Sequence, residues 1–206
     1  AADRAALLGD EGYETLVIAL LLVGFIYPSM GRLDDAATVV SRAVALCEEH
    51  GDTLHLVSAL NNRALFSACR GDRQGMMDDM RRVLSLARKL GQGSLELVGQ
   101  YNLGEYLYLM DAVDTAEPHI GRAIEIDRRI SGAAGRAVVA LLRARVRLFR
   151  GVEGDAREIA ADIRRRDDEA RSWGEVVLVP SEDVLCAMIE LATRPSTCAE
   201  WDELEE

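Results

Sequence analysis

Small and apolar side chains recur along this chain at an interval of 40 residues. The clearest copy runs from Asn102 to Ile126, where the pattern predicts two short helices that meet at a tight corner near Asp111. Shifted by 40 residues, this copy matches itself in four columns: Gly24, Ala64, Gly104 and Ala144; Ala36, Met76, Ala116 and Ala156; Ala43, Val83, Ala123 and Ile163; and, at the corner, Gly31, Gly71, Asp111 and Gly151. One period held over four copies predicts an array of helical repeats.

The first three columns have a physical explanation. Two helices that cross closely need small side chains at the crossing, because a larger one would push their axes apart. Bulky apolar residues around the crossing then complete the core. We therefore expect these columns to lie where helices pack, and the fourth column to hold the corner of each helix pair.

The register predicts four antiparallel helix pairs. They span residues 13–30 and 33–50, 53–70 and 73–90, 94–110 and 113–130, and 133–150 and 154 to about 171. Asp52 is a candidate N-cap, and Gly51 and Gly91 are candidate helix-ending glycines. Loops of two or three residues make neighbouring helices antiparallel.

The register slips after the fourth pair. Pro180 would interrupt a helix that began on schedule, so we expect an irregular stretch over residues 173–180. A shorter helix is expected over residues 181–192, with Ser181 as its candidate N-cap. Residues 196–206 are expected to form part of another helix.

The spacing within each copy resembles the tetratricopeptide repeat. Twelve residues separate the first small column from the second, seven more lead to the third, and the strings YNLGEYLYLMD and AEPHIGRAIEID are the clearest matches. The resemblance covers roughly residues 13–172, although each copy has 40 residues where the family usually has about 34. Copies of this length resemble those of large bacterial signalling ATPases and transcription activators. The resemblance implies an all-α fold, a right-handed α-α superhelix of antiparallel helix pairs.

The expected organisation is one solenoid domain over residues 1–206, because each repeat contacts only its neighbours and the array has no size limit. The chain starts without methionine, and residues 1–8 would fit the end of a preceding helix. We therefore expect a fragment of a larger protein. One lysine against 23 arginines indicates GC-rich codon usage and a bacterial source.

Charge and composition restrict the classes of partner and the cellular compartment that we expect. The net charge of -11 argues against direct binding to nucleic acid or to anionic membranes. Four cysteines without a CxxC pair favour a reducing cytoplasm. The most apolar run, residues 16–27, is shorter than the ~20 residues of a membrane span, so we expect a buried first helix. No signal peptide is evident.

In tetratricopeptide proteins the first helices of successive pairs line a concave groove that receives an extended peptide or a partner's helix. The resemblance places eight candidate partner-binding residues in this groove: Asn61, Asn62, Leu65, Tyr101, Asn102, Glu105, Tyr108 and Arg145. Asn62 and Asn102 recur at the same position, and a ladder of amides suits the alternating N–H and C=O groups of a peptide. The alternative is that these amides bond to neighbouring groups and lock the repeats together.

Related features are expected to be structural. The carboxylate clamp of chaperone-binding family members needs Lys or Arg where this chain has Ser58 and Val98, so we expect no clamp. Glu105 and Arg145 could simply bridge adjacent helices, and the tyrosines could be part of the core.

Five arginines crowd one predicted helix without an acid: Arg136, Arg143, Arg145, Arg147 and Arg150. They could hold a phosphate or an acidic peptide. The favoured alternative is that they pair with acids of neighbouring second helices, namely Glu117, Glu125, Asp127 and Asp155.

Catalytic and metal chemistry have little support. Cys47, His50 and His55 lie near one corner, but a zinc site would need a fourth ligand. His119 is isolated and is expected to be structural. The sequence has no nucleophile elbow, phosphate-binding loop or HExxH motif. We expect no enzyme, no metal and no cofactor.

The leading hypothesis is therefore a protein-interaction module of a larger cytoplasmic regulatory or signalling protein, which binds a peptide or partner domain in its groove. The first alternative is a structural scaffold that self-associates, as a possible homodimer, through the apolar first helix. The second is a small-ligand sensor of a transcription regulator, with its site around Tyr101, Asn102, Glu105 and Arg145.

Overall fold

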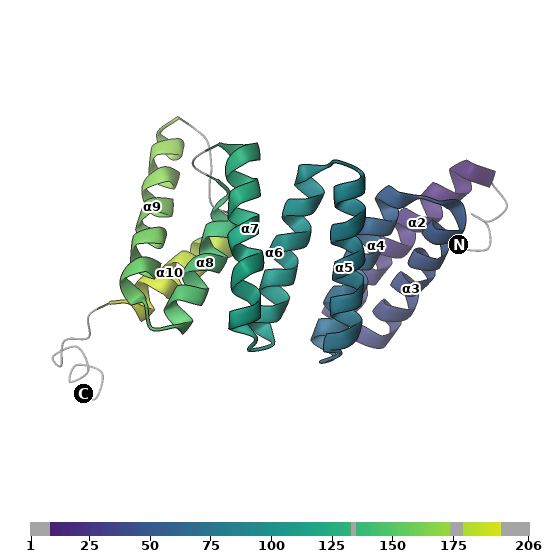
Figure 1. Ribbon diagram of the computed structural model, residues 1–206, viewed down its shortest axis with the longest axis horizontal. Helices are drawn as coiled ribbons and strands as arrows, with labels where there is room; N and C mark the ends of the chain where they lie inside the picture. Colours follow the sequence, from purple (N-terminus) through teal and green to yellow (C-terminus); the bar gives the residue numbers. More distant parts are fainter. Residues whose placement is uncertain (1–8, 133–134, 174–178, 195–206) are drawn as a thin grey trace. The chain divides into compact units, whose positions relative to one another are not determined.

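A computed structural model describes residues 9–132, 135–173 and 179–194 of the chain. Over these ranges the chain folds into helices joined by short turns and contains no strand (Figure 1). The expected all-α class is therefore confirmed. The predictions for residues 1–8 and 196–206, and most of the irregular stretch predicted at 173–180, lie outside the described residues.

The helices follow the predicted pairs closely. They are α2 (Gly9–Ile26), the short 3-10 helix η1 (Tyr27–Met30), α3 (Leu33–His50), α4 (Thr53–Cys69), α5 (Arg73–Lys89), α6 (Gly93–Leu109), α7 (Val113–Ser131), α8 (Ala137–Phe149), α9 (Glu153–Ser172) and α10 (Pro180–Ala192). The chain divides into two compact units between His119 and Ile120, within α7.

In the first unit, consecutive helices from α2 to α6 pack against one another in chain order. The helices α2 and α4 are also in contact, and so are α4 and α6. The first helices of successive pairs are therefore neighbours, as a helical repeat requires. In the second unit, α8, α9 and α10 pack against one another around a core of eight buried residues: Ala137, Leu141, Ala144, Ala156, Ala160, Ile163, Cys186 and Ile189.

The corner column is confirmed by the backbone. Gly31, Gly71 and Gly151 adopt φ values of 73°, 75° and 73°. Asp111 occupies the same corner with φ 58° and is the only non-glycine residue with positive φ in the described part of the chain. This left-handed conformation is open to glycine and tolerated by aspartate, because other side chains meet the backbone there.

The small columns are buried as expected. Ala64 and Ala144 of the first column, and Ala116 and Ala156 of the second, are 0% exposed. At Gly24 a Cβ atom would lie 2.5 Å from Cγ2 of Val40 on α3, far inside van der Waals contact. The absence of a side chain at Gly24 is what allows α2 and α3 to approach this closely.

The helix ends confirm most of the capping predictions. Asp52 caps α4, and its carboxylate accepts a hydrogen bond of 3.0 Å from the His55 backbone N–H. Gly51 ends α3 with φ 65°, and Gly91 has φ 64°.

The predicted N-cap at Ser181 is wrong. The helix α10 begins one residue earlier, at Pro180, and Val179 is its N-cap residue. Proline suits the first helical position because its missing N–H would be unpaired there in any case. The Glu182 carboxylate accepts the Val179 backbone N–H at 3.1 Å and takes over the capping role.

The prediction of a buried first helix is also wrong. Leu16, Val17 and Leu20 of α2 are buried, but Leu22 and Phe25 are 61% and 67% exposed. The helix packs against α3 and α4, whereas its sequence from Leu16 onward is apolar on all sides. The window Gly12–Met30 is long and apolar enough to cross a membrane, by length and composition alone. Core helices and signal sequences share these two properties.

We expect Ala64→Leu to lower the free energy of unfolding by about 1–3 kcal/mol, because three extra heavy atoms have no space at a fully buried helix crossing. Urea denaturation of the two proteins measures the difference. Ala19→Leu, at an exposed position of α2, is the control and should change the free energy by less than about 0.5 kcal/mol. Equal effects of the two substitutions would contradict the assignment of Ala64 to the crossing.

Candidate functional site

Two hollows in the described part of the chain, one in each unit, are candidate sites. The hollow in the first unit, here called the amide cleft, has a volume of about 130 Å³. It lies between α4 and α6 with α5 beneath it, and its lining residues are Val57, Ser58, Asn61, Asn62, Val83, Leu95, Val98 and Gly99. This is the surface on which the sequence predicted a groove.

The asparagines are brought together by the contact between α4 and α6. The Asn102 side-chain N–H group donates to Oδ1 of Asn61 at 2.8 Å, which ties the first helices of two successive pairs. The alternative, in which Asn62 and Asn102 bond to neighbouring groups, therefore holds for Asn102, whose partner is Asn61. Asn62 lines the cleft, is half-buried, and makes no side-chain hydrogen bond to another described residue.

The remaining groove candidates are engaged with their surroundings. Leu65 packs against a buried cluster that includes Val40 and Phe66, so it forms part of the wall. Tyr101, Glu105 and Tyr108 are half-buried, and each interacts with other residues of the chain. Arg145 belongs to the second unit. The bridge between Glu105 and Arg145 therefore stays a prediction.

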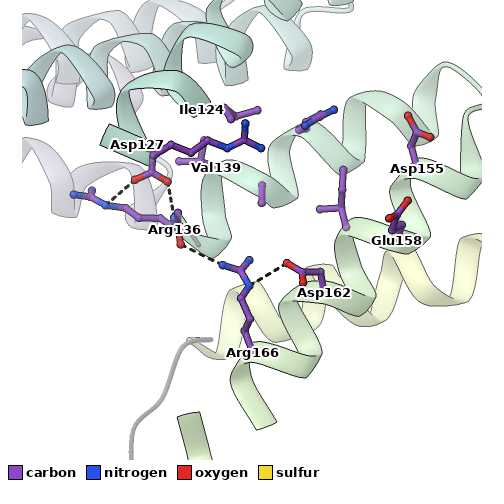
Figure 2. Close-up of a pocket in the computed structure, with 13 residues that line it drawn as sticks. Ile124, Asp127, Arg136, Val139, Asp155, Glu158, Asp162 and Arg166 are labelled. Atoms are coloured by element: carbon purple, nitrogen blue, oxygen red, sulfur yellow. Dashed lines mark hydrogen bonds and ion pairs between the residues drawn. The ribbon is translucent and has the colours of Figure 1, made fainter. Parts of the chain in front are cut away.

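The second hollow, here called the charged pocket, has a volume of about 460 Å³ and lies within the second unit (Figure 2). It is bounded by the last turns of α7, the first half of α8 and one face of α9. Its lining residues are Ile124, Asp127, Arg128, Gly135, Arg136, Val139, Ala140, Arg143, Asp155, Glu158, Ile159, Asp162 and Arg166.

One end of the charged pocket is closed by interactions around Asp127, which is 2% exposed. Its carboxylate accepts the backbone N–H of Arg136 at 2.5 Å and the hydroxyl of Ser131 at 3.0 Å. The Arg136 guanidinium lies 3.5 Å away and balances the buried charge. Nearby, Nε of Arg166 lies 3.2 Å from Oδ2 of Asp162 (Figure 2).

Pairing with acids is confirmed for two of the five crowded arginines. Arg136 pairs with Asp127, and Arg147 lies 3.8 Å from the carboxylate of Asp155. Arg145 and Arg150 also interact with other groups of the chain. Arg143 differs from them, because it is half-buried in the pocket and makes no ion pair with any described residue.

Comparison of positions 40 residues apart explains why Arg143 makes no ion pair with a described residue. Its counterpart in the second pair is Arg63, which donates from Nε and Nη2 to the two carboxylate oxygens of Asp79, both at 2.7 Å. These hydrogen bonds to Asp79 raise the pKa of Arg63. The residue at the position of Asp79 in the fourth pair is Ile159. The change from Asp79 to Ile159 can be read from the sequence, but only if positions outside the four small-residue columns are also compared at the 40-residue interval.

In the third pair the position of Asp79 makes a different contact, because Leu103 stands at the position of Arg63. His119 occupies the position of Asp79, and its Nδ1 lies 2.8 Å from Oε1 of Gln100. Burial, with a smaller contribution from Arg88, lowers the pKa of His119. The structural role expected for this histidine agrees with its hydrogen bond to α6.

The corner with Cys47, His50 and His55 forms a hydrogen-bonded and stacked cluster. The Tyr13 ring stacks on His50 with ring centres 4.0 Å apart, and the Tyr13 hydroxyl donates to Asp52 at 3.1 Å. Nδ1 of His55 lies 2.6 Å from the same carboxylate. Within the described ranges, no three His, Cys, Asp or Glu side chains are grouped so that they could hold a metal ion.

We expect the NMR titration of His119 to have its midpoint below the ordinary value of 6.5, because its surroundings disfavour the charged form. Since the unfolded chain then binds the extra proton more readily, His119 should reduce stability as the pH falls below about 6.5. In His119→Gln this part of the acid sensitivity should be lost. A midpoint at or above 6.5 would contradict the assignment.

Comparison with models of known protein families, and with curated proteins, finds no match to this chain. The likeness to tetratricopeptide repeats therefore rests on the columns and strings of the sequence. The geometry of the two hollows supplies the remaining evidence about function.

Proposed function

We propose that this chain is a protein-interaction module of the tetratricopeptide type, and that its amide cleft receives an extended segment of a partner protein. The observation that carries the proposal is the half-buried amide of Asn62, which lines the cleft without a partner among the described residues. A side-chain amide that neither donates nor accepts within the protein is available to a ligand.

Asn61, which lies beside Asn62, and its partner Asn102 add further hydrogen-bonding groups. In the bond between Asn61 and Asn102, one N–H of Asn102 and one oxygen of Asn61 are used. The Asn61 NH₂ group and the Asn102 oxygen are not consumed by that bond, since each amide has both functions. Asn61 and Asn62 line the cleft, and Asn102 is bonded to Asn61, so donors and acceptors are offered to a peptide backbone, whose N–H and C=O groups alternate.

The size of the cleft favours a peptide over a metabolite. Ligand pockets for small molecules usually measure about 300–1,000 Å³, whereas the amide cleft has about 130 Å³. Such a volume suits one side chain of a longer ligand. Val98, which is 42% exposed, offers an apolar contact beside it. The net charge of -11 favours a neutral or basic peptide.

A larger bacterial regulatory or signalling protein, located in the cytoplasm, is the context that fits this function best. A scaffold that presents a peptide groove needs neither a catalytic centre nor a cofactor. The right-handed superhelix implied by the resemblance would place successive first helices along one concave surface, and the contacts of α4 with α2 and α6 support that arrangement within the first unit.

Self-association is a second candidate function. It is favoured by the exposed apolar side chains of α2 and η1, which include Leu22, Phe25, Ile26 and Met30 at 56–67% exposure. Exposed apolar side chains that gather on one segment commonly mark an interaction site. Light scattering across a concentration series distinguishes the two functions, because a groove-binding module remains a monomer whereas a scaffold gains mass.

A random peptide library displayed on phage tests the groove. We expect selection on the immobilised protein to enrich related sequences, and Asn62→Ala to weaken their binding about tenfold, or ~1.4 kcal/mol. Fluorescence anisotropy with the synthetic peptides measures the change. Gln92→Ala removes an exposed amide at the turn before α6 and serves as the control. If no sequence is enriched, or if both variants bind the peptides equally well, the proposed site is wrong.

A further inference from the structure

The helix pair that lines the charged pocket differs from the second helix pair in one arginine contact. In the first unit, a carboxylate from the second helix of the pair, Asp79, binds Arg63 through two hydrogen bonds of 2.7 Å. Asp79 is 5% exposed and points into the protein. The planar guanidinium and the planar carboxylate match in this paired geometry, which is among the strongest that proteins form.

Arg143 and Ile159 take these two positions in the second unit. An isoleucine cannot accept a hydrogen bond, so Arg143 keeps the guanidinium without the carboxylate. Both residues line the charged pocket of about 460 Å³. A half-buried guanidinium gains from an anionic partner, because water solvates it less fully than at the surface.

The pocket lining carries four carboxylates and four guanidiniums, and one of the carboxylates, Asp155, pairs with Arg147 from outside the lining. Asp127 is balanced by Arg136, Asp162 by Arg166, and Asp155 faces Arg147 at 3.8 Å. Among the lining residues that remain, the cations are Arg128 and Arg143 and the anion is Glu158. The pocket is therefore suited to one added negative charge.

The acids on α9 limit which anion fits. Asp155, Glu158 and Asp162 lie along the wall opposite Asp127 (Figure 2). A phosphate carries close to two charges at neutral pH and would be repelled by this wall more strongly than a carboxylate. The apolar lining of Ile124, Val139, Ala140 and Ile159 offers a surface to a hydrocarbon body. The volume lies within the usual range of about 300–1,000 Å³ for small-molecule sites.

We propose that the charged pocket binds a small organic carboxylate with an apolar body, and that Arg143 holds the carboxylate as Arg63 holds Asp79. The carboxylate of the ligand takes the place that the Asp79 carboxylate has in the second helix pair. The site lies in the second unit and uses none of the residues of the amide cleft. Its test is therefore independent of the proposed peptide binding.

NMR titration of the whole chain at pH 7 tests the proposal with matched probes. The carboxylates are 4-methylpentanoate, hexanoate and phenylacetate, and the amine control is 3-methylbutylamine, which has a similar body without the carboxylate. We expect at least one carboxylate to shift the backbone signals of Val139 and Ile159, and the amine to leave them unchanged. If none of the three carboxylates shifts these signals at about 10 mM, the proposal is wrong.

Substitutions assign the binding to Arg143. Arg143→Gln should weaken the binding of the active carboxylate at least tenfold, whereas Arg42→Gln, which removes an exposed charge from α3, should leave it unchanged. Arg143→Lys keeps the charge but loses the paired geometry, so an intermediate affinity is expected. Unchanged affinity in a folded Arg143→Gln protein would show that the carboxylate binds elsewhere and would overturn the proposal. If Arg42→Gln also lost binding, the weaker binding of Arg143→Gln would reflect only the change in net charge, and the proposal would likewise be overturned.

Discussion

The close crossing of the helices is the constraint on which the rest of this structure depends. Gly24 approaches Val40 so closely that a single methyl group would not fit, and alanines with no exposed surface occupy the related crossings. Because the first column of crossings holds only glycine and alanine, the helices of a pair are held in one register. The positive φ angles at Gly31, Gly71, Asp111 and Gly151 then turn the chain at the same place in every pair.

A repeated backbone allows one position to carry different chemistry in successive copies. The position of Asp79 holds a carboxylate in the second pair, an imidazole at His119 in the third and an alkyl group at Ile159 in the fourth. The first two are engaged by Arg63 and Gln100 of the same pair. The helix pairs form with any of the three, since α5, α7 and α9 are all helical through this position. Different side chains at equivalent positions can therefore give one helix pair a pocket while the fold stays the same.

The sequence predicted most of the fold because its information was local and periodic. Helix ends followed from the glycine and aspartate at each corner, and α3 spans the predicted residues 33–50. The exposed side of α2 was not predictable, since Leu22 and Phe25 have the composition of core residues and only the packing shows which side is covered. The start of α10 was missed because the Glu182 carboxylate, and not Ser181, caps the helix.

The candidate sites were predictable only in part, because they depend on pairs of side chains. The three asparagines could be placed on neighbouring first helices, but the bond from Asn102 to Asn61 requires a register between α4 and α6 that the columns do not supply. The crowded arginines could be counted, and the four acids named for the group include Asp127 and Asp155, which pair with Arg136 and Arg147. Only the structure shows that Arg143 has no acidic partner among the described residues.

A double-mutant cycle tests the central claim, that positions 40 residues apart are structurally equivalent. Ile159→Asp introduces a carboxylate at the position that Asp79 occupies in the second pair, and Arg143→Met removes its expected partner. Urea denaturation of the parent, the two single variants and the double variant gives their coupling energy. We predict a favourable coupling of about 1.5–3 kcal/mol, the range of a hydrogen bond between charged groups. A coupling near zero would show that Arg143 and residue 159 do not meet as Arg63 and Asp79 do, and would contradict the claim.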